Sequence, residues 1–259
     1  MNSVTVRALL VRGMIAGVLA GLLAFGFAYL AGEPSVDAAI AFETAHSHDH
    51  GGGEEELVSR AVQSTAGLAT AALVYGIALG GITALAFCFA LGRIGRFGAR
   101  ATAALVALGG FVTVALVPFL KYPANPPAVG DPDTLNQRTA LFFLMIALAV
   151  LLAIGAVMLG RSLAARWGNW NATVAAGAAF TVAIAAFTAF LPSADALPDH
   201  FPAGVLWEFR LASLGVQALL WAALGLILGP LAERVLEPRT EKHPAPADPT
   251  TAPTSAPAH

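Results

Sequence analysis

Six long stretches of the chain contain no aspartate, glutamate, lysine, arginine or histidine. They cover residues 13–31, 67–91, 101–119, 141–159, 172–191 and 211–229. A helix that crosses the hydrocarbon core of a bilayer needs roughly 20 apolar residues. Because lipid offers no hydrogen-bond partners to the backbone, each stretch is expected to be helical. The pattern predicts an all-α, polytopic membrane protein with about six transmembrane helices, arranged as three hairpins with long outer loops.

The composition agrees with a membrane protein. Of the 259 residues, 57% are hydrophobic and only 12% are charged, whereas soluble domains carry roughly 25% charged residues. The net charge of −2 argues against nucleic-acid binding through phosphates. The single cysteine, Cys88, excludes an internal disulfide and a paired-cysteine metal site. The chain has no P-loop, HExxH or GxSxG motif, so we expect neither an enzyme nor an organic cofactor.

The distribution of basic residues predicts the orientation. With the N-terminus inside, the inner segments hold ten of the 14 basic residues, in accord with the positive-inside rule. These ten are Arg7, Arg12, Arg93, Arg96, Arg100, Arg161, Arg166, Arg234, Arg239 and Lys242. We therefore expect a multi-pass protein of the cytoplasmic membrane with both termini inside. Residues 1–236 form the transmembrane domain, and residues 237–259, rich in Pro, Ala and Thr, form a disordered cytoplasmic tail.

The first outer loop is rich in histidine. His46, His48 and His50 fall within five residues, beside Glu43 and Asp49. Imidazole suits cobalt, nickel, zinc and copper, and alternate residues of an extended segment project to one side. One hypothesis is an outward-facing capture site for a divalent transition metal. The alternative is a solvated loop whose histidines bind nothing.

Three arginines lie at the outer starts of predicted helices, where the helix dipole disfavours a cation. They are Arg60, Arg138 and Arg210, and nearby acids offer partners: Glu56 for Arg60, Asp131 and Asp133 for Arg138, and Glu208 for Arg210. The arginines are either structural ion pairs or parts of an outer vestibule lined by paired charges. The full set of candidate vestibule residues is Lys121, Asn125, Asp131, Asp133, Arg138, His200, Glu208, Arg210, Arg60, Gln63 and Gln217.

Proline and glycine add two local expectations. The proline-rich segment 118–138 is predicted to be a stiff, non-helical loop, and Pro118, near the end of a span, is expected to free a backbone carbonyl. Gly13, Gly17 and Gly21 are spaced four apart, as are Gly76 and Gly80. Such small-residue faces let helices pack closely in lipid.

Several motifs resemble the CbtA family of predicted cobalt transporters. They are Gly-Glu-Pro at residues 32–34, the histidine-rich loop, residues 58–64, the proline segment 118–130, and Trp-Glu-Phe-Arg-Leu-Ala-Ser at 207–213. The resemblance covers residues 7–235. It implies a membrane subunit that takes up cobalt for cobalamin supply, with nickel or zinc as other candidate substrates. It also implies a small histidine-containing membrane partner of the CbtB type, besides membrane lipid. The alternative function is a membrane metal sensor or scaffold that transports nothing.

Overall fold

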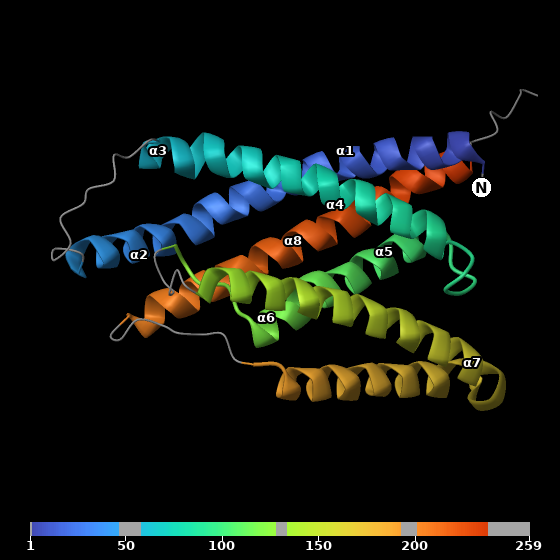
Figure 1. Ribbon diagram of the computed structural model, residues 1–259. Helices are drawn as coiled ribbons and strands as arrows, with labels where there is room; N and C mark the ends of the chain where they lie inside the picture. The colour runs from blue at the N-terminus through green and yellow to red at the C-terminus, as the bar shows by residue number, and fades with distance from the viewer. Residues whose placement is uncertain (1, 47–57, 128–133, 193–200, 238–259) are drawn as a thin grey trace, which may run out of the picture.

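Every element of the described chain is helical. The computed structural model describes residues 2–46, 58–127, 134–192 and 201–237, and no strand occurs within these ranges. Its elements are α1 (Ser3–Phe27), the π-helix η1 (Ala28–Gly32), α2 (Glu33–His46), α3 (Arg60–Val62), the π-helix η2 (Gln63–Gly67), α4 (Leu68–Ala90), α5 (Ala99–Gly110), the π-helix η3 (Phe111–Leu116), α6 (Val117–Lys121), α7 (Leu135–Phe190) and α8 (Ala203–Leu236). Figure 1 shows long helices running roughly along one direction. The expected all-α fold is confirmed.

Five helical runs in the described residues are long and apolar enough to cross a membrane. They are Ser3–Ala45, Arg60–Ala90, Ala99–Lys121, Leu135–Phe190 and Ala203–Leu236. This finding agrees with a membrane protein. The first run continues well past residue 31, where the first apolar stretch ends, so residues 33–46 are helical rather than part of an open loop.

The π-helical segments η1 and η3 are each followed by a proline. Pro34 comes two residues after η1 ends, and Pro118 comes two residues after η3 ends. Proline lacks an N–H and cannot bond the carbonyl four residues earlier, and a wider π-type turn is one way for a helix to absorb that loss. The helix therefore passes through both prolines. The prediction of a non-helical loop over residues 118–138 is wrong at both ends, because α6 continues to Lys121 and α7 begins at Leu135.

The longest helix, α7, is broken once. Its 56 residues would extend about 84 Å at 1.5 Å per residue, far more than the roughly 30 Å of a bilayer core. Gly168 has φ 76° and ψ 162°, a left-handed conformation that favours glycine. A Cβ on Gly160 would lie 3.3 Å from the Cβ of Ala176, so the two arms are in contact, and Figure 1 shows them running side by side. Two predicted spans, 141–159 and 172–191, lie one in each arm; the total of six stays a prediction.

The tightest contact in the fold joins α1 to α4. A Cβ added to Gly17 would overlap the carbonyl oxygen of Gly76, and one added to Gly80 would lie 2.9 Å from the Cα of Gly17. Gly13 and Gly21 meet α4 in the same way, at Gly80 and at the carbonyl oxygen of Ala72. The expectation that these glycine faces pack helices closely is confirmed.

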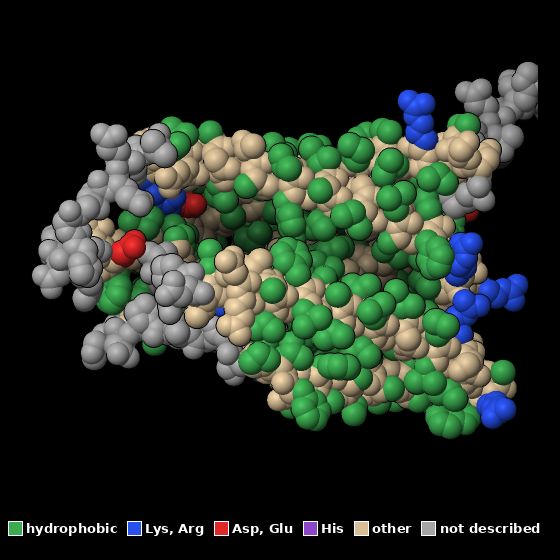
Figure 2. Space-filling model, viewed as in Figure 1, with side chains coloured by type: hydrophobic (Ala, Val, Ile, Leu, Met, Phe, Trp, Pro, Cys, Tyr) green, Lys and Arg blue, Asp and Glu red, His purple; other side chains and the backbone are tan. Residues whose placement is uncertain are grey.

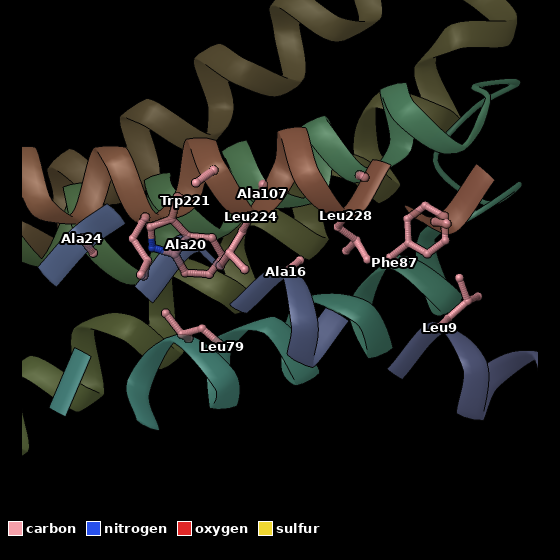
Figure 3. Close-up of a cluster of buried hydrophobic side chains, with 14 of the residues drawn as sticks. Leu9, Ala16, Ala20, Ala24, Leu79, Phe87, Ala107, Trp221, Leu224 and Leu228 are labelled. Carbon is pink, nitrogen blue, oxygen red and sulfur yellow. The ribbon is translucent and has the colours of Figure 1, made fainter. Parts of the chain in front are cut away.

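A buried apolar cluster fills the space between α1, α4, α5 and α8. Figure 3 shows Trp221 and Leu224 of α8 beside Ala20 of α1 and Leu79 of α4. Trp221 is only 4% exposed, and the edge of its ring lies against Gly110 of α5, where a Cβ would overlap it. The bundle of these four helices is the framework on which the polar ends of the molecule are held.

The two ends of the bundle differ in charge. Figure 2 shows Lys and Arg side chains gathered at the end where α1 begins, α4 ends and α7 bends back. This basic end also holds an ion pair between Arg100 of α5 and Glu233 of α8, 2.6 Å apart. The opposite end, where α2 ends and α3, α7 and α8 begin, is called the loop end below. This separation of charge is the one that the sequence predicts, while the direction of the bundle across a membrane stays a prediction.

Candidate functional site

Arg60 at the loop end binds two carboxylates of α2. The Nη2 atom of Arg60 forms ion pairs with Glu33 and with the Oδ1 of Asp37, the latter at 2.9 Å. The Nε of Arg60 also donates to the Oδ1 of Asp37, at 3.0 Å. Glu33 and Asp37 are one turn apart on α2, so they present both carboxylates on one side. Arg60 therefore has acidic partners, as expected. The pairing expected with Glu56 stays a prediction, because Glu56 lies outside the described residues.

Arg210 joins α8 to the proline-rich segment. Its Nη2 donates to Asn125 Oδ1 at 2.9 Å, and its Nε donates to the carbonyl oxygen of Ala124 at 3.3 Å. Glu208, the expected partner, lies two residues away on the same helix, and residues at that spacing do not face each other. The structure thus brings together Arg210 and Asn125, two predicted vestibule residues that are far apart in sequence.

Tyr122 holds the start of the proline-rich segment. Its hydroxyl donates to the carbonyl oxygen of Pro192 at 3.0 Å, and its side chain is 8% exposed. Burial raises the pKa of this hydroxyl, which keeps it protonated and able to donate. The neighbouring Lys121 ammonium lies 6.0 Å from the centre of the Tyr122 ring. Asp131 and Asp133, the carboxylates of the same proline-rich segment, lie outside the described residues. Tyr122 and Arg210 together fix residues 122–125 at the loop end.

Gln217 lies deeper in the bundle, two turns below Arg210 on α8. Its Nε2 donates to the hydroxyl of Tyr75 on α4 at 3.4 Å. Its Oε1 is buried and has no hydrogen-bond partner within the described residues, and the same holds for Asn125 Nδ2. An unmet hydrogen bond of this kind costs about 1–3 kcal/mol.

Gln63, another predicted vestibule residue, has a local structural contact. Its Nε2 donates to the carbonyl oxygen of Val58 at 2.9 Å, which fixes the start of α3.

The histidine-rich segment falls largely outside the described residues. Glu43 and His46 belong to α2, and His46 is the last residue of that helix. The expectation of an extended strand of alternating histidines is therefore wrong for His46, because the helix begun at Glu33 continues through it. His48, Asp49 and His50 lie outside the described residues, as does His200. Within the described ranges, no group of three His, Cys, Asp or Glu side chains is placed to hold a metal ion.

Sequence reasoning missed four groups at the loop end. Glu33 and Asp37 were unassigned because they follow directly on an apolar stretch, although their spacing of four was a signal that both face one way. Tyr75 and the carbonyl of Ala124 gave no sequence signal, since each acts only through a distant helix. Arg138 is the fourth residue of α7, close to the helix start, where it was expected.

The site is a set of polar cross-links at the loop end. One joins α2 to α3, and two others hold the start of the proline-rich segment against α8 and against Pro192. Arg60 is neutralised by two carboxylates, while Arg210 is held by an amide and a carbonyl oxygen. Unpartnered amide atoms of Asn125 and Gln217 remain beside and below it. Within the described residues, the unpartnered oxygen of Gln217 can replace part of the water shell of a hard or borderline cation. The unpartnered nitrogen of Asn125 is a hydrogen-bond donor and cannot coordinate a cation.

Comparison with known proteins gives one family. Neither the curated proteins nor the solved structures compared with this chain gave a match. The family model CbtA, described as "Probable cobalt transporter subunit", matches residues 6–233, nearly the whole helical part of the chain. The match includes every cross-link of the loop end, from Glu33 to Gln217. The chain therefore belongs to the CbtA family of probable cobalt transporter subunits.

Proposed function

We propose that this chain is the membrane-embedded subunit of a cobalt uptake system linked to cobalamin supply. Support comes from its family, from five helical runs in the described chain that are long enough to cross a membrane, and from the polar loop end. A subunit implies at least one further component, and a small histidine-containing membrane protein of the CbtB type is the proposed partner. Nickel and zinc remain competing substrates, because affinity among these ions follows the metal more than the site.

The buried carbonyl oxygen of Gln217 is the observation that carries a transport role rather than a purely structural one. It lies on α8 below Arg210 and has no partner in the described chain. A passing cation that keeps part of its water shell would satisfy this oxygen. Arg210 keeps its positive charge, and its bonds to Asn125 and Ala124 hold the guanidinium in one place.

The outer part of the route is proposed at the vestibule residues. Lys121 and Glu208 lie next to Tyr122 and Arg210, and Arg138 lies at the start of α7. The other proposed residues are Asp131, Asp133 and His200, which lie outside the described residues. Alternating acids and bases would screen one another, and the acids in excess would raise the local concentration of divalent cations.

A test of the route compares two glutamines. In cells that lack other cobalt importers, uptake of radiolabelled cobalt is measured for the chain alone and together with its partner. Gln217→Leu removes the unpartnered oxygen and is expected to reduce the uptake rate at least tenfold, about 1.4 kcal/mol, at unchanged membrane abundance. Gln137→Leu is the matched control, because Gln137 is an exposed residue of α7 that is not among the vestibule residues. Equal uptake by wild type and Gln217→Leu would refute the route.

The metal sensor or scaffold remains the second candidate function. If this chain, with and without its partner, gives only the uptake of empty cells, transport is wrong and a sensing role is favoured. Cobalt-dependent changes in partner binding would then be the property to measure.

Metal capture by the histidine-rich segment is a separate proposal. His46, His48 and His50, with Glu43 and Asp49, are proposed to bind cobalt on the outer side and deliver it to the vestibule. Replacing the three histidines with alanine is expected to slow uptake at low external cobalt and to leave uptake at saturating cobalt unchanged, because capture matters only when the ion is scarce. Unchanged uptake at every concentration would exclude the capture role and leave the Gln217 route standing.

A further inference from the structure

A groove of about 630 Å³ lies at the bend of α7, at the basic end of the molecule and opposite the loop end that holds the candidate site. Arg166, Trp167, Trp170 and Asn171, on either side of the break at Gly168, form one part of its lining, called the mouth below. Val174, Ala175 and Ala178 line the rest, and they continue along the second arm of α7. The groove therefore has a polar, cationic mouth and an apolar floor.

The break at Gly168 creates this arrangement. Its φ of 76° reverses the chain between Trp167 and Trp170, so that the end of the first arm and the start of the second arm share one opening. The arms pack through another face of the second arm, where Ala172 and Ala176 are 1% and 7% exposed. The face that carries the groove is left open, with Val174 54% exposed.

The residues of the mouth suit a phosphate ester. The guanidinium of Arg166 offers paired donors that match phosphate oxygens, and the amide of Asn171 offers two more. Trp167 and Trp170, 54% and 79% exposed, are of the type that collects at the level of lipid headgroups. No carboxylate lines the groove, so nothing there repels an anion.

The apolar floor of the groove distinguishes between two candidate ligands, a phospholipid and a free phosphate ion. From Asn171 to Ala178 the helix advances about 10 Å at 1.5 Å per residue, enough to follow the first part of an acyl chain. Val174, Ala175 and Ala178 would contact such a chain but would add nothing to the binding of inorganic phosphate. The basic residues gathered at this end (Figure 2) add an attractive field for anionic headgroups.

We propose that the groove at the bend of α7 binds one anionic glycerophospholipid, with its phosphate at Arg166 and Asn171 and an acyl chain along Val174, Ala175 and Ala178. Basic pockets beside transmembrane helices are known to take such headgroups. The site is independent of the metal route at the other end of the molecule, so either proposal can fail alone.

The test is competitive lipid retention by the full-length chain. The protein in detergent is incubated with an equimolar mixture of phosphatidylglycerol and phosphatidylcholine, and retained lipids are counted by native mass spectrometry. Wild type is expected to retain phosphatidylglycerol preferentially. Arg166→Gln should lower that preference about fivefold, the factor that corresponds to roughly 1 kcal/mol for one basic residue near anionic lipid. Arg161→Gln is the matched control, because Arg161 is also exposed on the same helix but does not line the groove.

A second variant tests the floor without changing charge. Ala178→Phe fills the apolar part of the groove and should reduce retention of phosphatidylglycerol while leaving the helix content and melting temperature unchanged. Inorganic phosphate, added in excess over lipid, should not displace the bound lipid. Displacement by phosphate would show an anion site and overturn the lipid assignment. Equal retention by wild type, Arg166→Gln and Ala178→Phe would overturn the site itself.

Discussion

The contact between α1 and α4 allows a stringent test of the packing, because one helix offers both the variant and its control. Gly17 and Gly26 both belong to α1. A Cβ on Gly17 would overlap the carbonyl oxygen of Gly76 and would lie 3.0 Å from the Cα of Ile77, whereas a Cβ on Gly26 would meet nothing within 4 Å. Both obstacles to Gly17→Ala are backbone atoms, which cannot rotate away.

The expected energies have opposite signs. Gly17→Ala should push α1 and α4 apart and lower the free energy of unfolding by about 1–3 kcal/mol, the usual range for overpacking. Gly26→Ala should raise it by up to about 1 kcal/mol, because alanine loses less backbone entropy in a helix. Circular dichroism during titration of the purified protein from mild detergent into SDS gives both values. Equal or higher stability of Gly17→Ala than of Gly26→Ala would refute the close approach of these helices.

Three further predictions concern the cross-links. Tyr122→Phe removes the hydroxyl that bonds Pro192 and should lower stability by about 1 kcal/mol, measured by the same titration; no change would mean that the bond contributes nothing. The double variant Glu33→Gln and Asp37→Asn leaves the Arg60 charge without its carboxylates, and membrane abundance should fall, whereas adding Arg60→Gln should restore it. Arg100→Gln should change stability by less than about 1 kcal/mol, since the Arg100 side chain is 67% exposed; a larger loss would show that its pair with Glu233 is structural.

Much of the scaffold follows from sequence alone. Uninterrupted apolar stretches predict helices because lipid leaves the backbone no other partner, and the spacing of Gly13, Gly17 and Gly21 predicts one close contact. The end of the first helix was misjudged, because the apolar stretch ends just before Glu33 and Pro34. In the structure, α2 follows η1 directly and includes both residues. Polarity marks where a span leaves the lipid, and it does not mark where a helix ends.

The polar contacts were harder to predict. Acids close in sequence to Arg60 and Arg210 were the natural candidates, but neighbouring residues on a helix point in different directions. The partners in the structure come from other segments: Asp37 of α2 for Arg60, and Asn125 of the proline-rich segment for Arg210. Such pairs depend on how the helices are placed against one another, which a single sequence does not encode locally. Arg60 and Arg210 themselves were found because their charge conflicts with their place in the chain.

The π-helical turns give the bundle uneven mechanical properties. All three, η1, η2 and η3, lie in the half of the bundle nearer the loop end. A π turn has a looser backbone ladder than an α turn and can migrate by one residue along its helix. Nearer the basic end, α1 and α4 are in contact through backbone atoms, for example at Gly13 and Gly80, so there is no space for these helices to approach further. Any rearrangement that lets an ion pass can thus be confined to one half, while the remainder serves as a rigid anchor in the lipid.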